Sequence, residues 1–220
     1  MNKQKMLDRI VKNSFWRGLY YRFKHNHFDK GITLDLEGRL VSCVIKQEKG
    51  NVGNRVVIKK RTNLINTYIE FHGSNNLVSI DENGQIISNH LFVYDDNNTL
   101  QIGKHFNSGR DTTIAILEGG SITIGDDCLF SYNVEVRNSD SHSLMDDKGN
   151  RINYAKDVVI GNHVWMAQRA IVLKGAIIND GCVVAANALV TNHFFEPASL
   201  LGGLPARVMK SGIDWYIGRL

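Results

Sequence analysis

Residues 160–191 decide the fold of this chain. Divided into units of six, they read IGNHVW, MAQRAI, VLKGAI, INDGCV, VAANAL and VT. An aliphatic residue or methionine opens each unit, at Ile160, Met166, Val172, Ile178, Val184 and Val190. Four places later stands a small or slim residue, at Val164, Ala170, Ala176, Cys182 and Ala188. A period of six fits neither the 3.6-residue repeat of a helix nor the alternation of a single strand.

The six-residue period predicts a chain that turns a corner after each unit. Every flat side then sends one apolar and one small side chain inward. Three sides make a coil of about 18 residues, and coils stack at the strand spacing of about 4.8 Å. We therefore predict an all-β fold, a parallel β-helix.

The composition suits one globular domain with appendages. Of the 220 residues, 43% are hydrophobic and 22% are charged, which supplies enough apolar side chains for a long core. A net charge of +4 without a basic block of interleaved aromatics argues against nucleic acid as a partner. The opening MNKQKMLDRI lacks the apolar core of a signal peptide, and no apolar run reaches the ~18 residues of a membrane span. We therefore expect a cytoplasmic location.

The three cysteines are an odd number and show no CxxC spacing. Cys128 and Cys182 both fall on the small inward position of a hexapeptide. The pattern favours a role as core filler over the alternative of a reactive thiol.

Residues 1–30 have a different pattern. Apolar residues recur there at helical spacing, at Leu7, Ile10, Val11, Phe15, Leu19 and Phe23. We favour a helix that caps the open end of the β-helix, whose unpaired strand edge needs cover. The alternative is an interfacial helix on an anionic membrane, because basic residues lie among Trp16, Tyr20 and Tyr21. Residues 31–53 contain only strand-like fragments.

A second repeat, of 22 residues, begins at Arg55. Its blocks are RVVIKKRTNLINTYIEFHGSNN, LVSIDENGQIISNHLFVYDDNN, TLQIGKHFNSGRDTTIAILEGG and SITIGDDCLFSYNVEVRNSDSH. Each block has isoleucine in its fourth place, at Ile58, Ile80, Ile102 and Ile124. We interpret the block as an 18-residue coil with a corner widened by about four residues. The asparagines that end the first two blocks favour ladders of stacked side-chain amides.

The repeat is interrupted between Ile124 and Ile160. This step of 36 residues equals two coils of 18, but the second, HSLMDDKGNRINYAKDVV, has no hexapeptide character. We predict a polar loop over residues 142–159. Because side chains fill the interior of a β-helix, chemistry must take place outside it, where such a loop forms a wall.

These patterns divide the chain into three parts. We expect a helical cap over 1–30, a β-helix with the projecting loop over 31–195, and a tail over 196–220. Gly-Gly and Pro205 break the repeat in the tail, and Trp215 and its neighbours fold back onto the solenoid in our interpretation.

The run VVIGNHVWMAQRAIVLKGAIINDGCVVAANALVT, followed by GGLPARVMK, resembles the hexapeptide-repeat acyltransferases. The similarity covers residues 55–212. The stretch NSDSHSL resembles the O-acetyltransferases of capsule and lipopolysaccharide clusters more than the maltose and galactoside acetyltransferases. The resemblance implies a left-handed coil, a homotrimer with active sites between subunits, acetyl-CoA as donor, a sugar hydroxyl of a surface polysaccharide as acceptor, and no metal.

The resemblance also implies that His142 is the general base. Transfer of an acetyl group from a thioester to an alcohol needs a base that takes the alcohol's proton, and a histidine is largely neutral in the cytosol. Asp140 is a candidate to orient the imidazole, with a backbone carbonyl as an equal alternative. Asn133 is a weaker candidate for holding the acceptor or the imidazole.

The coenzyme-binding residues follow from the same comparison. Trp165 matches the VW motif whose indole lies against the coenzyme arm or the histidine, with subunit packing as the alternative. Ala167 replaces the glycine of the usual VWIG. Ala185 and Ala186 match small residues that line the pantetheine groove, although small residues also suit a corner.

Three residues near the end of the chain match contacts to the adenosine-phosphate part, namely Thr191, Arg207 and Lys210. Asn192 stands where the family often has lysine. Phosphate contacts of this kind agree with a mildly basic chain.

The sequence is also compatible with three other functions. The first is an N-acetyltransferase of nucleotide-linked amino sugars, which the preferred acceptor would reveal. The second is a zinc hydratase with this fold, but the eight histidines show no pair at ligand spacing. The third is a non-catalytic scaffold that binds no acyl-CoA.

Overall fold

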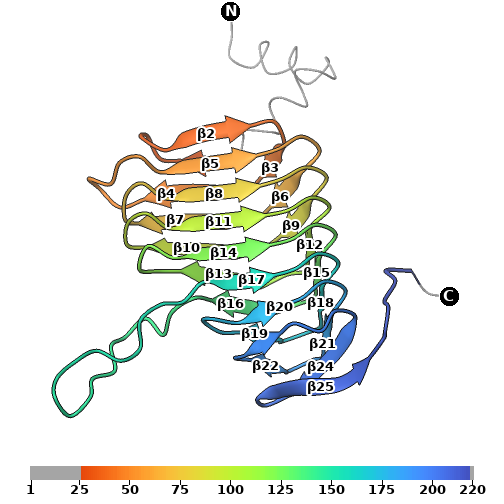
Figure 1. Ribbon diagram of the computed structural model, residues 1–220. Helices are drawn as coiled ribbons and strands as arrows, with labels where there is room; N and C mark the ends of the chain where they lie inside the picture. Colours follow the sequence, from red (N-terminus) through yellow and green to blue (C-terminus); the bar gives the residue numbers. More distant parts are fainter. Residues whose placement is uncertain (1–25, 219–220) are drawn as a thin grey trace, which may run out of the picture.

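A computed structural model describes residues 26–218, and all regular structure in that range is β-strand (Figure 1). The strands form three sheets, named A, B and C here, that run the length of a solenoid. Sheet A contains β1 (His27–Phe28), β4 (Val44–Gln47), β7 (Tyr68–His72), β10 (His90–Tyr94), β13 (Thr113–Ile116), β16 (Glu135–Arg137), β19 (Ile171–Val172) and β22 (Leu189–Val190).

Sheet B contains β2 (Thr33–Leu36), β5 (Arg55–Ile58), β8 (Leu77–Ile80), β11 (Thr99–Ile102), β14 (Ser121–Ile124), β17 (Val158–Ile160), β20 (Ile177–Ile178) and β23 (His193–Phe194). Sheet C contains β3 (Arg39–Val41), β6 (Asn63–Ile65), β9 (Gln85–Ile87), β12 (Asn107–Ser108), β15 (Leu129–Phe130), β18 (Trp165–Met166), β21 (Val183–Val184), β24 (Ser199–Gly203) and β25 (Ala206–Ser211). All pairings are parallel except that of β24 with β25. The predicted parallel β-solenoid is thus confirmed.

The isoleucines of the 22-residue blocks stack in register in sheet B. Ile58 pairs with Ile80, Ile80 with Ile102, and Ile102 with Ile124, and all are buried. The hexapeptide prediction is confirmed as well, because its apolar and small positions point into the core. Cys128 and Cys182 are buried among them, and burial raises the pKa of the Cys128 thiol to about 12. These two cysteines therefore fill the core and are not activated nucleophiles.

The predicted amide ladder is present where sheet A turns into sheet B, the A–B corner. Asn54, Asn76 and Asn98 lie one above another and are buried. The Nδ2 of Asn76 donates to Oδ1 of Asn54 at 3.1 Å, and the Nδ2 of Asn98 donates to Oδ1 of Asn76 at 3.0 Å. Each Oδ1 also accepts the backbone N–H of the next asparagine. The ladder satisfies backbone groups that the widened corner leaves without strand partners.

We expect Asn76→Ala to lower the free energy of unfolding by about 1–3 kcal/mol, because it leaves the buried N–H of Asn98 without an acceptor. Chemical denaturation measures the change. Gln101→Ala, on the exposed outer side of β11, is the matched control and should cost no more than about 0.5 kcal/mol. Equal losses in the two variants would contradict the structural role of the ladder.

The interruption of the repeat differs from the sequence expectation. Ile124 pairs directly with Ile160, so the 36-residue step makes one coil and not two. The extra residues form a loop over 138–157 at the A–B corner, and Val158 and Val159 belong to β17. Figure 1 shows this loop projecting from the side of the solenoid. The loop thus lies between Arg137 and Val158 in the structure, whereas the sequence pattern suggested 142–159.

Both ends of the solenoid also lie beyond the predicted bounds. Most of the predicted helical cap, residues 1–25, lies outside the described residues. His27–Phe28 form strand β1 and pair with β4, so the helix does not extend to residue 30. At the other end β24 joins β21 in sheet C, which extends the solenoid into the predicted tail. Within the described range, no helix is long and apolar enough to cross a membrane.

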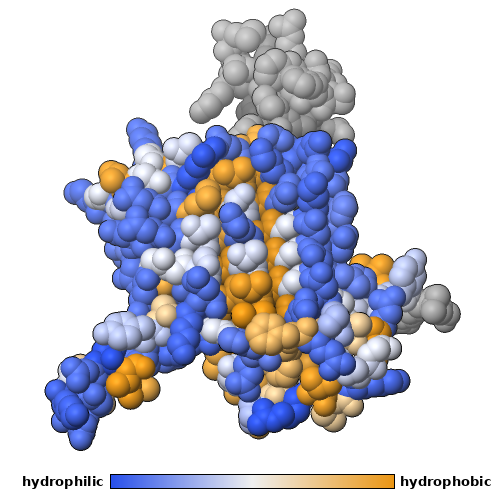
Figure 2. Space-filling model, in the orientation of Figure 1, coloured by the Kyte–Doolittle hydropathy of each residue, from blue (hydrophilic) through white to orange (hydrophobic). Residues whose placement is uncertain are grey.

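Figure 2 shows one long face of the molecule, with an apolar strip along the solenoid axis between hydrophilic margins. The loop leaves this face at one margin and has a hydrophilic tip. Since the interior is filled by side chains, functional groups must be sought on the corners and outer faces.

Candidate active site

The projecting loop is anchored at its base by Glu118. The Glu118 carboxylate accepts hydrogen bonds from Oγ of Ser139 at 2.6 Å and from Nη2 of Arg151 at 2.7 Å. Its second oxygen accepts the N–H of Ala155 at 3.3 Å. Ser139 lies where the chain leaves the solenoid, and the other two lie where it returns. The Glu118 carboxylate therefore binds both the first and the last part of the loop to the preceding coil.

These hydrogen bonds lower the pKa of the Glu118 carboxyl. The hydrogen bond from Arg151 is the main reason that the pKa of Glu118 falls from 4.5 to about 2, and the bond from Ser139 adds to it. Because the folded-state pKa is lowered, the stabilising contribution is complete above pH 4.5 and is lost as the pH falls towards 2.

We expect Glu118→Gln to release the base of the loop. The free energy of unfolding of the wild type should exceed that of the variant by a constant amount above pH 4.5, and the difference should shrink towards pH 2. Thermal unfolding between pH 2 and 7 measures this, and limited proteolysis locates the released loop. Glu82→Gln, which breaks ion pairs on the solenoid surface, should leave the cleavage rate of the loop unchanged.

His142 stands at the start of the projecting part of the loop, with an exposed side chain. Its backbone is held on both sides: its N–H donates to the carbonyl of Asp140 at 2.8 Å, and its carbonyl accepts Nδ2 of Asn153 at 2.8 Å. Within the part of the chain that the structure describes, the imidazole makes no hydrogen bond. The backbone is fixed while both ring nitrogens are free for other partners.

Asp140 does not bond to the imidazole in this chain. Its Oδ2 accepts Nδ2 of Asn153 at 2.8 Å and forms an ion pair with Lys174. The hydrogen bond from Lys174 is the main reason that the pKa of the Asp140 carboxyl is lowered. The hydrogen bond from Asn153 lowers it further. Asp140 thus shapes the backbone around His142 through the buried Asn153. Neither Asn153 nor Lys174 stands out in the sequence, because only the register that pairs Glu135 with Ile171 and Val136 with Val172 brings Lys174 onto the coil directly after Asn138.

A second set of candidates gathers where sheet C turns into sheet A, the C–A corner. Successive coils place residues 109–112, 131–134, 167–170 and 185–188 there. Ala167 and Ala185 occupy the same place on neighbouring coils, and the N–H of Ala167 bonds to the Val184 carbonyl that precedes Ala185. Ala186 follows on the exposed side. Ala167 and Ala185 therefore form a column of small side chains, with Ala186 beside it and Gln168 above Ala186.

Asn133 lies on the same corner, one coil above Ala167. Its φ of 58° is left-handed, and the equivalent residues Asp111, Arg169 and Asn187 have φ of 61°, 60° and 59°. Asn and Asp tolerate this conformation better than most residues. The backbone thus explains an asparagine here, and its exposed side chain is free to act on a ligand.

Trp165 lies on the outer side of β18 and not at a corner, because the strand alternates Trp165 outward with Met166 inward. Trp215 of the tail approaches it, with ring centroids 6.0 Å apart. The Trp215 ring stacks on His163 at 4.3 Å, and its Nε1 donates to the His163 carbonyl at 2.8 Å. The predicted return of the tail is confirmed for Trp215, whereas Tyr216 and Ile217 are exposed.

The residues matched to phosphate contacts divide between two corners. Arg207 lies on β25 opposite Gly202, which itself follows Ala185 in the small-residue column. Lys210 lies on the same strand, opposite Leu200, and both basic side chains are exposed. Thr191, with Asn192 after it, lies on the A–B corner below the loop.

The structure therefore brings the candidates together in two groups. Trp165, Ala167, Ala185, Asn133 and the basic residues of β25 lie along sheet C and the C–A corner. His142, Asp140 and Thr191 lie on the A–B corner, which sheet A separates from the first group.

The chain is similar to proteins of known activity. No family model matches the sequence. A polysialic acid O-acetyltransferase of Neisseria meningitidis is 34% identical over 185 residues, which are 74% of this chain and 86% of that protein. This chain belongs to the hexapeptide-repeat acyltransferases. The resemblance inferred from residues 55–212 is thereby confirmed, and the protein is an enzyme that transfers acyl groups.

Two solved structures superpose on this acyltransferase. The polysialic acid O-acetyltransferase OatWY is 27% identical and superposes with a TM-score of 0.75, over 89% of this chain and 92% of that one. The polysialic acid-specific acetyltransferase NeuO has the same fold, with a TM-score of 0.78, 24% identity, and coverage of 89% and 84%. Among the described residues of this acyltransferase, no group of three or more His, Cys, Asp or Glu side chains is placed to hold a metal ion.

Proposed function

We propose that this acyltransferase moves an acetyl group from acetyl-CoA to a sugar hydroxyl of a bacterial surface polysaccharide. The observation that carries the proposal is the ordered loop base that fixes the backbone of His142 and leaves its imidazole without a partner in the described chain. The related enzymes reported above are O-acetyltransferases, which favours oxygen over nitrogen as the acceptor atom. We place the reaction in the cytoplasm, where acetyl-CoA is available.

His142 acts as the general base in this proposal. Its imidazole takes the proton of the sugar hydroxyl while the oxygen attacks the thioester carbonyl carbon. The carbon–sulfur bond then breaks, and the imidazolium returns the proton to the leaving thiolate. Asp140 and Asn153 act as positioning residues, because they hold the peptide of His142 and do not reach its ring.

The donor binds along the C–A corner in this proposal. The small side chains of Ala167, Ala185 and Ala186 leave room for the pantetheine arm, with Trp165 beside it. Arg207 and Lys210 on β25 receive the phosphates, for which exposed basic side chains are suited. Thr191 lies on the other corner and contributes to the phosphate site of a neighbouring subunit.

We further propose a homotrimer whose active sites lie between subunits. One chain carries His142 on the A–B corner and the coenzyme column on the C–A corner, with sheet A between them. A closed ring of three chains brings the first corner of each subunit to the second corner of the next. Each site then takes its base from one chain and most of its donor contacts from another.

Subunit complementation tests this arrangement. His142→Ala removes the base, and Ala185→Trp fills the coenzyme column, so each variant alone should be inactive. Random mixing of the two in equal amounts should restore roughly a quarter of wild-type activity, because half of the bases and half of the columns are intact. Mixed trimers, isolated with two affinity tags, that show no activity would place the whole site within one chain.

The acceptor is tested by acetyl-dependent CoA release with polysaccharides from the host surface. Turnover with a polysaccharide, and none with UDP- or dTDP-linked amino sugars, is the expected result. Preferential use of an amino sugar nucleotide would instead favour N-acetyl transfer. Failure to bind any acyl-CoA would overturn the enzymatic assignment as a whole.

A further inference from the structure

The tail of the chain returns to the solenoid along the corner where sheet B turns into sheet C, the B–C corner. After β25 the N–H of Ile213 donates to the Ala198 carbonyl at 2.9 Å, and Trp215 then reaches His163, two coils earlier. His163, Gly181 and Ala198 hold the same place before β18, β21 and β24. Gly181 has no side chain, which leaves room for the tail to cross the middle coil. Figure 1 shows this return as the segment that leaves β25 and runs upward beside the solenoid.

His163 holds the returning tail through three contacts. The Trp215 ring stacks on its imidazole, with ring centroids 4.3 Å apart and an angle of 8° between the planes. The Trp215 Nε1 donates to the His163 carbonyl at 2.8 Å, and the Asp214 carboxylate lies 3.2 Å from the His163 Nε2. A stack and a hydrogen bond to the same residue fix both the position and the tilt of the indole. Trp215 is therefore the anchored part of a tail whose next two residues, Tyr216 and Ile217, are exposed.

The anchored Trp215 indole lies beside Trp165, the residue that the proposed function places next to the pantetheine arm. The two ring centroids are 6.0 Å apart, and the ring planes are inclined by 44°. Trp165 is 36% exposed, and it lies on the outer side of β18. An indole on the flat outer side of a sheet keeps its rotational freedom unless a neighbour packs against it. Trp215 is such a neighbour, and it approaches Trp165 from the B–C corner.

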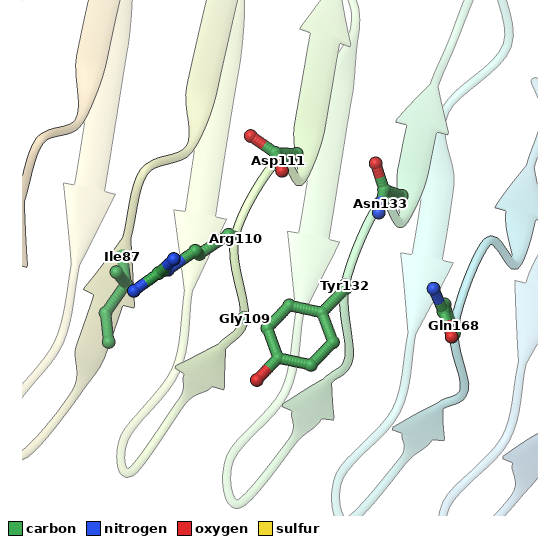
Figure 3. Close-up of a pocket in the computed structure, with 7 residues that line it drawn as sticks. All are labelled: Ile87, Gly109, Arg110, Asp111, Tyr132, Asn133 and Gln168. Carbon is green, nitrogen blue, oxygen red and sulfur yellow. The ribbon is translucent and has the colours of Figure 1, made fainter.

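The opposite edge of sheet C is open. A hollow of about 560 Å³ lies there on the C–A corner, and Figure 3 shows Gln168 in its lining together with Tyr132 and Asn133 of the preceding coil. Gln168 follows Trp165 by three residues, so this edge is the side from which a donor on the C–A corner reaches the Trp165 indole. The tail thus packs against one side of the indole and leaves the side that faces the donor free.

We propose that Trp215 is a positioning residue for the donor, because it holds the Trp165 indole in the orientation that packs on the pantetheine arm. Without Trp215 the indole has to be ordered when acetyl-CoA binds, and ordering a side chain on binding lowers the affinity. Trp215 acts through Trp165 and does not itself contact acetyl-CoA. The inference rests on the proposed acetyl transfer and adds a residue that sets the affinity for the donor.

Steady-state kinetics of CoA release by the full-length protein test this role. Trp215→Ala should raise the KM for acetyl-CoA about fivefold, as expected when one more side chain must be ordered on binding, and should leave kcat within about twofold. Trp215→Phe keeps a ring over His163 but lacks the indole N–H, so its KM should lie between those of the wild type and Trp215→Ala. Tyr216→Ala removes the adjoining aromatic side chain, which is exposed, and should leave both constants unchanged.

A measurement without turnover separates this role from a general loss of stability. In protein labelled with fluorotryptophan, the fluorine resonance of Trp165, assigned with Trp165→Phe, should broaden in Trp215→Ala before any coenzyme is added. The affinity for CoA, measured by calorimetric titration, should fall about fivefold in the same variant. An unchanged Trp165 resonance, or an unchanged KM and CoA affinity, would overturn the role of Trp215 and leave the acetyl transfer intact. A wild type that neither binds nor releases CoA would overturn the proposed function together with this inference.

Discussion

Replacement of His142 by alanine should lower kcat by about 10²–10⁴-fold, the range by which a positioned general base accelerates proton transfer. The KM for acetyl-CoA should stay within about twofold, because the donor contacts lie on the C–A corner and the base lies on the A–B corner. The fold should be unaffected, since the imidazole makes no contact that the described chain depends on. CoA release under saturating donor and acceptor measures the change.

His105→Ala is a suitable control for this experiment. His105 is also an exposed histidine, but it lies at the turn from sheet B to sheet C and bonds to Asp127 at 2.9 Å. Its loss should leave kcat unchanged. Near-normal turnover in His142→Ala would exclude the histidine as the base, whatever its position in the loop.

The largest expected loss of stability follows Phe130→Ala. The Phe130 ring is buried on the inner side of β15 and meets Phe106 edge to face, with centroids 4.9 Å apart. Removing it leaves a cavity in the middle of the solenoid core, which should lower the free energy of unfolding by about 3–5 kcal/mol. Chemical or thermal denaturation measures this loss. The C–A corner, which begins one residue later, should lose order at the same time.

Phe92→Ala provides the comparison, because Phe92 is only half-buried on the outer side of β10. Its ring stacks on neighbouring aromatic side chains but does not fill the core. The expected cost is about 1 kcal/mol, typical for a partly exposed position. A similar cost for both variants would show that the stacked interior does not dominate stability.

The sequence was sufficient to predict the solenoid because each coil repeats the same local rule. An aliphatic residue opening each hexapeptide and a small residue four places later both point inward, and Ile58, Ile80, Ile102 and Ile124 stack as their spacing predicts. The same regularity predicts the amide ladder. His142 lies in an ordered loop base outside the solenoid, and its backbone is hydrogen-bonded on both sides.

Other features could not be predicted because they depend on contacts between distant residues. A step of 36 residues is compatible both with two coils and with one coil carrying an insertion, and only the pairing of Ile124 with Ile160 decides. The anchoring of the loop by Glu118, and the attachment of Asp140 to Lys174, join side chains 20 or more residues apart without any local pattern.

The constant register of sheet B has an evolutionary implication. Because every coil touches only the coils before and after it, a 22-residue block such as 77–98 is a spacer that genetic duplication or deletion can add or remove whole. Such an event would move the N-terminal segment by one strand width and leave the catalytic half of the protein unchanged. Proteins descended from one ancestor can thus differ in the number of their coils while they catalyse the same reaction.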